Sequence, residues 1–336
     1  MASVQVVILN WNGRSFLERF LPAVVANTLP YVGIVVADNG SDDDSVAFVA
    51  EAFPTVSVVR LDRNYGFAEG YNKALDHLDA EYFVLLNSDA EPAPGWLDPL
   101  IAKLESDPAV AAVAPKLLSW NERGRFEYAG ASGGFIDSLG YPFCRGRIMS
   151  SVEFDNGQYD DARDVFWGTG ACLMVRSEVY RSLGGFDGSF FAHMEEIDFC
   201  WRAQLAGYRI CVEPASVVYH LGGGTLPQNT PRKIFLNFRN NLMMLYKNLS
   251  GRSLWWVISA RLVLDGVAAL GWLVAGKVDF FKAVWQAHRD FFNRRRGLRS
   301  VRADIQASRK ASPLHIYRGS IILRYILGRK KFGNLI

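Results

Sequence analysis

Three carboxylates and one histidine, far apart in the chain, are the residues whose types and settings best suit chemistry. Asp38 ends the apolar run VGIVVAD, and Asp89 ends YFVLLNSD after Asn87 and Ser88. A carboxylate at the end of a buried strand could accept hydrogen bonds from a ribose or a base. It could also bind Mg²⁺ or Mn²⁺ that bridges phosphate oxygens. The alternative for each Asp is that it only caps a turn.

An acidic pair, Glu195-Glu196, opens the segment EEIDFCWRAQL, whose composition predicts a helix. Adjacent carboxylates repel each other, which raises one pKa and favours a general base. Acids at a helix N-terminus also stabilise the helix dipole, so a structural role is the alternative. Asp198 points to another face and can pair with Arg202, four residues further on. We therefore assign the structural role to Asp198 and the chemical role to Glu196.

A metal site needs more than one ligand, and His220 could supply the second. It ends the run SVVYH, shortly before Gly222-Gly223-Gly224. An imidazole and a carboxylate together suit a divalent cation. The alternative is that His220, like many histidines after a strand, is structural.

The elements that must position these residues alternate between strand and helix. Apolar runs at 4–10, 32–41, 55–61 and 82–89 predict buried strands, and helical spacing follows at 14–27 and 63–78. This alternation predicts an α/β fold with a doubly wound, mainly parallel, Rossmann-like sheet. Ligands of such sheets bind beyond the carboxyl ends of the strands. In this chain those ends carry Asn10, Asn12, Asp38, Asn64, Gly66, Asn87 and Asp89.

Two common nucleotide signatures are missing from the sequence. It contains no Gly-x-Gly-x-x-Gly and no Gly-x-x-x-x-Gly-Lys-Ser/Thr, which argues against a nicotinamide or flavin site and against a P-loop. Residues 117–164 are rich in glycine, aromatic and polar residues without a sustained period, which predicts loops and short strands over the site. From residue 231 onward the composition is helical.

Composition places the protein among globular proteins of a reducing compartment. Half of the 336 residues are apolar. The N-terminal MASVQVVILNWNG predicts an immediate first strand and no signal peptide. The four cysteines form no Cys-x-x-Cys pair and are expected to be free thiols. We therefore expect a cytoplasmic protein.

The net charge of +3 conceals an asymmetry. Residues 281–336 contain 14 Lys and Arg and 2 acids, which leaves 23 basic and 32 acidic residues before them. A basic tail on an acidic body predicts an anionic surface as partner, either lipid or nucleic acid. No nucleic-acid recognition motif accompanies the tail, so we expect a membrane and no nucleic acid. A homo-oligomer is compatible with the sequence.

Taken together, these stretches make the chain resemble the family 2 glycosyltransferases, which use nucleotide-sugars and have the GT-A fold, and especially the rhamnosyltransferase-like members of bacterial surface glycan synthesis. The resemblance covers residues 4–248 and keeps the family's order of motifs. The matching stretches are VVILNWNG, VVADNGSDD, RNYGFAEGYNKAL, FVLLNSDAEP, GTGACLMVRSEVYRSLGGFDGSFFAHMEEIDFCWRAQLAGYRICVEPASVVYHLGGGT and FLNFRNNLMMLYKN.

The resemblance implies a role for each candidate residue. Asp38 would contact the nucleobase, beside the turn at Asn10 and Asn12. The family's Asp-x-Asp falls on Asn87-Ser88-Asp89, so Asp89 would hold the divalent cation with His220, and Glu196 would be the catalytic base beside Glu195. The remaining positions expected at the donor are Asn64, Gly66, Phe67, Gly168 and Thr169.

The implied reaction is an inverting sugar transfer to a lipid-linked or polysaccharide acceptor. Two positions depart from the family pattern: Asn87 replaces the first acid of the triplet, and Glu196 replaces the more frequent Asp. The alternatives are a nucleotidyltransferase and a non-catalytic nucleotide-sugar-binding protein. We expect residues 1–230 to form the catalytic domain, with a donor half at 1–116 and an acceptor half at 117–230. Residues 231–336 would form a helical, basic, membrane-associating region.

The run LWWVISARLVLDGVAALGWLV, residues 254–274, is long enough to span a bilayer. It contains Arg261 and Asp265, each of which costs about 2.5 to 3.5 kcal/mol at the centre of a membrane helix. The apolar residues return a comparable amount, whereas lying at the interface avoids the cost. We therefore predict peripheral association with the inner face of the membrane. The alternative is an amphipathic helix packed on the catalytic domain.

Overall fold

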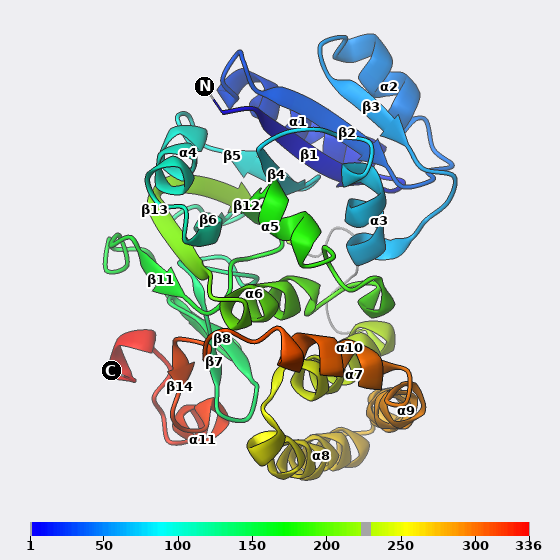
Figure 1. Cartoon of the computed structure of the whole chain (residues 1–336), viewed down its shortest axis with the longest axis vertical. Coiled ribbons are helices and arrows are strands. Elements are labelled where there is room, and N and C mark those ends of the chain that lie inside the picture. The colour runs from blue at the N-terminus through cyan, green and yellow to red at the C-terminus, as the bar shows by residue number, and fades with distance from the viewer. Residues whose placement is uncertain (1, 223–229, 336) are drawn as a thin grey trace.

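The computed structural model describes residues 2–222 and 230–335, and in these residues the central element is a nine-stranded mixed sheet (Figure 1). The strand order is β11-β13-β6-β12-β4-β1-β2-β3, and β5 pairs with β13. Gly223 and Gly224, expected in the loop after His220, lie outside the described residues. The strands of this sheet are β1 Val4–Asn10, β2 Gly33–Asp38, β3 Ser57–Arg60, β4 Tyr82–Asn87, β5 Ala90–Pro92, β6 Val110–Ser119, β11 Arg163–Val165, β12 Cys172–Arg176 and β13 Arg209–His220.

The four strands predicted from apolar runs are all present, as β1 to β4. They are parallel and lie in the order β4-β1-β2-β3. The central residues of β1, β2 and β4 are buried because helices cover both faces of the sheet, whereas those of the edge strand β3 are only half-buried. In this register Asn10 lies beside Asp38, and Leu9 lies beside Asn87. The polar ends of three strands therefore lie at one edge, as the sequence predicts.

Two sets of helices cover the two faces. Apolar residues of α1, α2 and α4 form one core with the sheet, and those of α3, α5 and α6 contribute to the other. The predicted helix at 14–27 is present with those bounds, whereas the one predicted at 63–78 is shorter. The helices of this part are α1 Arg14–Asn27, α2 Ser45–Ala52, α3 Gly66–Leu75, α4 Leu97–Ser106, α5 Ser177–Ser182 and α6 Glu195–Leu205, with a 3₁₀ turn at Gly188–Phe190.

Short strands after β6 form a second sheet, in the region where loops and short strands were expected. Its order is β10-β9-β8-β7-β14. The last strand comes from the C-terminal tail, which is therefore not entirely helical: β14 pairs in parallel with β7 and completes its free edge. The strands are β7 Gly134–Asp137, β8 Pro142–Cys144, β9 Arg147–Ile148, β10 Ser151–Val152 and β14 Ile316–Tyr317.

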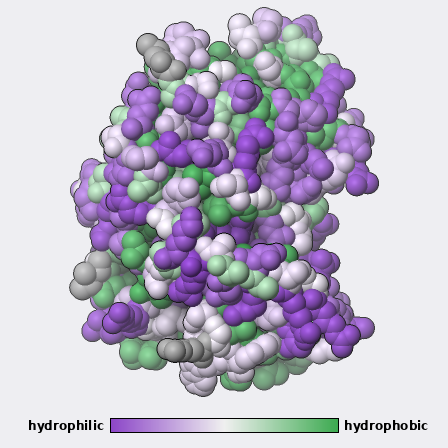
Figure 2. Space-filling model, in the orientation of Figure 1, coloured by the Kyte–Doolittle hydropathy of each residue, from purple (hydrophilic) through white to green (hydrophobic). Residues whose placement is uncertain are grey.

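The tail forms a layer of helices at the end of the molecule opposite β2 and β3 (Figure 1). On the face drawn in Figure 2, hydrophobic residues gather along the lower edge, where Figure 1 places α8. All four cysteines are free and buried. The tail elements are α7 Pro231–Asn248, α8 Gly251–Val274, α9 Val278–Arg294, α10 Leu298–Ala307 and α11 Ile321–Ile326, with a 3₁₀ turn at Phe332–Asn334.

Candidate active site

The ends of β1 and β2 hold Asn10 and Asp38 against each other. Asn10 Nδ2 donates to Asp38 Oδ1 at 3.3 Å and to Ser45 Oγ at 3.0 Å, and the amide of Ser41 donates to Asp38 Oδ2 at 3.2 Å. Both side chains are buried, and Asn10 Oδ1 is buried without a hydrogen-bond partner. A buried carboxylate fixed in this way can accept hydrogen bonds from a ligand at the strand ends. Asn12, in contrast, is exposed, and its Oδ1 accepts from the amide of Asp42 at 2.8 Å.

Gly66 and Phe67 begin α3, and Asn64 lies just before it. Asn64 Oδ1 accepts from the amide of Gly66 at 2.8 Å. Gly66 has a φ of +79°, and a Cβ added there would lie 2.5 Å from the ring of Phe191, so only glycine fits. The amides of Phe67 and Ala68 donate to the carbonyl of Phe191. These predicted donor residues therefore connect the start of α3 with the loop that precedes α6.

Asp89 and His220 meet at the junction of β5 and β13. His220 Nε2 lies 3.0 Å from Asp89 Oδ1 and 3.2 Å from Asn87 Nδ2, and both Asp89 and His220 are buried. On the other side of the ring, His220 Nδ1 lies 3.5 Å from Glu127 Oε1. Burial alone would lower the pKa of His220, but the contacts with Asp89 and Glu127 raise that pKa to about 10. The two residues predicted as metal ligands are thus side by side.

Glu127 is the residue of this cluster that sequence reasoning missed. It is buried and lies in the irregular segment between β6 and β7, where no hydrophobic period marks it. One of its oxygens accepts from the amide of Ala129, and the other faces His220. Its sequence neighbours, Phe126 and Tyr128, are aromatic, and the segment around them has no pattern that would mark Glu127 as a functional residue.

Glu196 lies in the first turn of α6 with Glu195. Both Oε2 atoms are buried and have no hydrogen-bond partner. Burial raises the pKa of Glu196 to about 7, against the opposing effect of nearby backbone amides that include Gly170. Burial, and then the charge of Glu196, raises the pKa of Glu195 well above its ordinary range. A carboxylate whose pKa is close to neutral can take up a proton and release it again under working conditions.

Gly170 and Ala171 connect Glu196 with the strand ends. A Cβ added at Gly170 would be 3.6 Å from Glu196 Cδ, and the neighbouring carbonyl of Ala171 accepts from the amide of Asn87 at 2.9 Å. Burial raises the pKa of the Cys144 thiol against the opposing effect of Arg147, and the charges of Glu127 and Glu196 add to the rise. The three carboxylate groups at Glu196, Asp89 and Glu127 are thus arranged around one edge of the sheet.

The contacts of the predicted donor residues Gly168, Thr169 and Ser88 are with neighbouring parts of the protein. Thr169 is 3% exposed, and its hydroxyl accepts from the amide of Ala171 at 3.1 Å. A Cβ at Gly168 would lie 2.5 Å from a methyl group of Leu173, so this glycine is required by packing. Ser88 is half-buried between Asn87 and Asp89. Their place at the donor stays a prediction.

The backbone before α6 is strained. Phe191, His193 and Met194 have φ values of 66°, 71° and 74°, a region that residues with a side chain rarely adopt. Asn240 of α7 holds this loop because its Nδ2 donates to the carbonyls of Phe190, Ala192 and His193 at 2.8 to 3.0 Å. Its motif, FRNN, matched the family in sequence, but only the structure shows that Asn240 supports the loop of Glu195 and Glu196.

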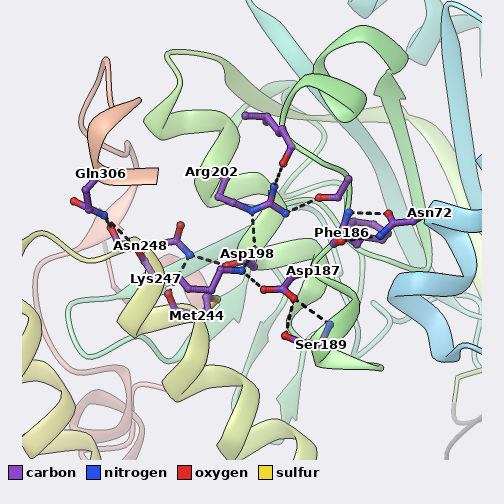
Figure 3. A network of polar contacts seen from close by, with 12 residues as sticks. Asn72, Phe186, Asp187, Ser189, Asp198, Arg202, Met244, Lys247, Asn248 and Gln306 are labelled. Atoms are coloured by element: carbon purple, nitrogen blue, oxygen red, sulfur yellow. Dashed lines mark hydrogen bonds and ion pairs between the residues drawn. The ribbon is translucent and has the colours of Figure 1, made fainter. Parts of the chain in front are cut away.

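Asp198, two residues beyond Glu196, is fully satisfied (Figure 3). It is 0% exposed, and it accepts from Arg202 Nε at 2.8 Å, from Lys247 Nζ at 2.9 Å and from Asn248 Nδ2 at 2.7 Å. Lys247 also donates to Asp187 Oδ2. The predicted pair with Arg202 is therefore present, and Asp198 joins α6 to α7.

This open α/β sheet with carboxylates at its strand ends is the GT-A fold of the glycosyltransferases. The fold of S. aureus TarS 1–349, solved with UDP-GlcNAc, matches with a TM-score of 0.58 at 16% identity, covering 97% of this chain and 92% of that one. The mannosyltransferase PcManGT of Pyrobaculum calidifontis, solved with GDP-Man and Mn²⁺, matches with a TM-score of 0.53 at 16% identity, covering 92% and 86%. At this identity the likenesses show the fold.

The chain belongs to glycosyltransferase family 2: the model described as Glycosyl transferase family 2 matches residues 5–184, just over half of the chain. It is 26% identical over 280 residues to the N-acetylglucosaminyl-diphospho-decaprenol L-rhamnosyltransferase of Mycobacterium tuberculosis, covering 79% of this chain and 90% of the relative. The pre-mycofactocin glycosyltransferase of the same organism is 29% identical over 226 residues, covering 65% and 42%.

These findings confirm the resemblance and the fold inferred from the sequence. The chain is a glycosyltransferase, and the nucleotidyltransferase alternative is set aside. The intact Glu195-Glu196 pair, with two unpartnered oxygens, argues against the non-catalytic alternative. In the described residues, no group of three His, Cys, Asp or Glu side chains is arranged to hold a metal, so a cation would depend on Asp89 and His220.

Proposed function

We propose that the protein is an inverting glycosyltransferase in which Glu196 is the catalytic base. The observation that carries the proposal is the state of Glu196: its Oε2 is buried without a partner, and burial raises its pKa to about 7. It also lies against Gly170, whose neighbour Ala171 is bonded to Asn87 at the end of β4. A base in this position faces the edge at which a GT-A sheet binds its donor.

In the proposed reaction Glu196 accepts the proton of an acceptor hydroxyl. The hydroxyl oxygen forms a bond to the anomeric carbon of the donor sugar as the bond from that carbon to the diphosphate oxygen breaks. The electron pair of the broken bond leaves on the nucleoside diphosphate, and attack from the opposite side inverts the anomeric centre. Glu195 lies beside Glu196, and burial, followed by the charge of Glu196, raises the pKa of Glu195 well above its ordinary range.

Asp89 and His220 would hold a divalent cation, Mg²⁺ or Mn²⁺. The donor set fits, because a carboxylate oxygen and an imidazole nitrogen lie 3.0 Å apart, and a cation held between them would take the place of the proton on His220 Nε2. The cation, when bound, neutralises charge that develops on the departing diphosphate. Glu127 fits the role of a positioning residue, because a carboxylate on the far nitrogen of a ligating histidine fixes the orientation of the ring.

Asp38 and Asn10 would recognise the nucleoside, with Asn12, Asn64, Gly66 and Phe67 around the donor. The name of one relative supports a rhamnosyl or similar group as the transferred sugar, because the relative that is covered over 90% of its length is named as an L-rhamnosyltransferase. dTDP-rhamnose is therefore the first candidate donor, and UDP- and GDP-sugars follow.

The proposed acceptor is lipid-linked or a polysaccharide of the bacterial surface, met at the inner face of the cell membrane. The name of the same relative, which includes a diphospho-decaprenol, supports a lipid-linked acceptor. In this proposal residues 1–116 bind the donor, residues 117–230 bind the acceptor, and residues 231–336 associate with the membrane.

Thermal unfolding with a panel of nucleotide-sugars, with and without Mn²⁺, tests the donor site. A ligand at about 100 times its Kd stabilises the folded state by about 2.7 kcal/mol. We expect one nucleotide class to raise the melting temperature of the wild type in a Mn²⁺-dependent manner, and the Mn²⁺ dependence to disappear in Asp89→Asn. If no nucleotide-sugar stabilises the protein in Mn²⁺, or if Asp89→Asn retains the full effect, the donor site is misassigned.

A further inference from the structure

Helix α8 carries apolar residues on the face that packs against the protein and also on the face that points outward. The outward side chains include Trp256, Val263, Val267, Leu270 and Val274, which are 73%, 67%, 63%, 55% and 90% exposed. These positions recur at the period of a helix and form one apolar stripe. Between Trp255 and Lys277 the chain has two charged residues, Arg261 and Asp265, and neither is exposed. A soluble surface rarely presents a continuous apolar stripe without a function.

The two charges inside the apolar segment point into the protein. Arg261 and Asp265 are 3% and 1% exposed. The Arg261 guanidinium lies 3.7 Å from the ring centre of Tyr141 and donates to the carbonyls of Leu139 and Gly140 at 3.2 and 3.3 Å. Asp265 lies 3.4 Å from Arg261 Nη2. These contacts fix which side of α8 is free.

This arrangement supports the peripheral location predicted from the sequence over a helix that spans the membrane. The part of α8 at Ser253–Val274 has a mean hydropathy of 1.7 and is 28% buried, so its length and composition would allow it to cross a membrane. Crossing would remove Arg261 and Asp265 from their partners and place both in hydrocarbon, at about 2.5 to 3.5 kcal/mol each. Lying at the interface preserves every one of these contacts and still covers the apolar stripe.

Basic and aromatic residues border both ends of the stripe. Near the beginning of α8, the Arg295 guanidinium lies 5.3 Å from the ring centre of Trp255, which is 49% exposed. At the other end Lys277 follows directly and is exposed. Exposed tryptophans favour the headgroup level of a bilayer, and Lys or Arg beside them favour anionic lipid.

We propose that the outward face of α8 is the membrane-docking surface of this enzyme, with the helix lying in the plane of an anionic bilayer. The helix, about 36 Å long, would place Trp255 and Trp256 at one end of the contact and Lys277 at the other. The inference deepens the proposed function and rests on it only for its purpose, because a lipid-linked acceptor has to be met at a bilayer. Docking itself requires neither donor nor acceptor.

Charge argues for a bilayer rather than a second copy of this chain. Residues 281–336 carry 14 basic and 2 acidic residues, so two copies placed face to face through this layer would bring like charges together. An anionic headgroup layer is complementary to the same charges. The apolar stripe and the basic tail therefore both favour an anionic bilayer as the partner.

Flotation of the full-length protein with vesicles tests the inference. Vesicles of phosphatidylcholine with and without phosphatidylglycerol are compared for the wild type and for Val263→Asp/Val267→Asp. Tyr31→Asp, at a residue that is 51% exposed and far from α8 in sequence, is the matched control. We expect anionic vesicles to bind the wild type and the control equally, and the double variant at least about tenfold more weakly. A milder variant, Val263→Ser/Val267→Ser, should lie in between.

The changed residues are exposed, so the melting temperatures of all variants should equal that of the wild type. Unaltered vesicle binding by a folded double variant would overturn the inference, as would equal binding to neutral and anionic vesicles. Sedimentation without lipid provides a further check: a dimer that dissociates in the double variant would assign the face to a second copy. Donor-dependent stabilisation is measured separately, so a failure of docking and a failure of the transferase proposal are distinguishable.

Discussion

Glu196 and Asp198 lie two residues apart on α6, and the structure treats them in opposite ways. Asp198 is 0% exposed and is bonded by Arg202, Lys247 and Asn248 (Figure 3). Glu196 has a buried oxygen with no partner and a pKa raised to about 7 by burial. The loop before it is strained at three residues, whereas the network around Asp198 consists of well-formed hydrogen bonds.

The difference between the surroundings of Asp198 and Glu196 explains how one helix can be held firmly and still carry a reactive group. A buried carboxylate with three cationic or amide donors is stable in its charged form and has no capacity left for chemistry. A carboxylate with a buried oxygen that lacks a donor costs stability, and proteins retain such groups where function needs them. Asp198 and its partners hold α6 rigidly against α7, and this rigidity allows Glu196 to stay in an unfavourable setting.

The largest expected effect is on turnover in Glu196→Gln. The variant removes the base without changing the shape of the side chain, so we expect kcat to fall by about 10²- to 10⁴-fold. The affinity for the nucleotide-sugar should stay close to that of the wild type, because donor contacts are made elsewhere. Steady-state kinetics and donor titration measure the two quantities. Glu178→Gln, at an exposed acid of α5, is the control and should be fully active.

Asp198→Asn should have the largest effect on stability. It leaves Arg202 and Lys247 facing a neutral group in a buried place, and the loss of one partner of a buried pair costs about 3 to 5 kcal/mol. Asp279→Asn, which removes an exposed pair with Lys282, should cost about 1 kcal/mol or less. Urea unfolding of both variants makes the comparison. Equal losses would mean that the Asp198 network does not anchor α6.

Glu127→Gln should weaken the cation site without unfolding the protein. A carboxylate that orients a ligating histidine typically contributes about 10- to 100-fold to metal affinity. Calorimetric titration of Mn²⁺ in the absence of substrate, with the melting temperature as control, measures the effect. Unchanged Mn²⁺ affinity in Glu127→Gln would mean that Glu127 does not orient His220 for the cation.

The smallest expected effect is a gain of stability in Glu196→Gln, opposite in sign to Asp198→Asn. The folded-state pKa of Glu196 is about 7 and its ordinary value is 4.5. The protonated form therefore favours folding below pH 4.5, and this contribution is lost as pH rises through about 7. Because Gln resembles the protonated acid, the variant should exceed the wild type by about 1 to 2 kcal/mol at about pH 8 and match it near pH 4. Urea unfolding at both pH values measures the difference.

Much of this comparison could be predicted from the sequence, because its determinants are local. The strands β1 to β4 are continuous apolar runs, their polar ends follow from strand direction, and the Asp198–Arg202 pair follows from helical spacing. Glu127 could not be found in this way, because it lies in an irregular segment and acquires its role through contact with His220, far along the chain.

Two further features depend on contacts that a sequence pattern does not contain. The strain at Phe191, His193 and Met194 exists because Asn240 of α7 fixes the carbonyls of the loop. The face of α8 that is free depends on where Arg261 and Asp265 find partners, and the sequence, which predicts peripheral association, does not show which face that is. Tertiary contacts determine both the strain in the loop before α6 and the free face of α8.

The pH dependence of turnover tests the central claim most directly. If Glu196 is the base and one of its oxygens is buried without a partner, kcat should rise with pH through an apparent pKa close to 7 and level off above it. This acid limb should be absent from the residual activity of Glu196→Gln. A wild-type profile that is level down to about pH 5, or a variant that keeps the same limb, would contradict the assignment of Glu196.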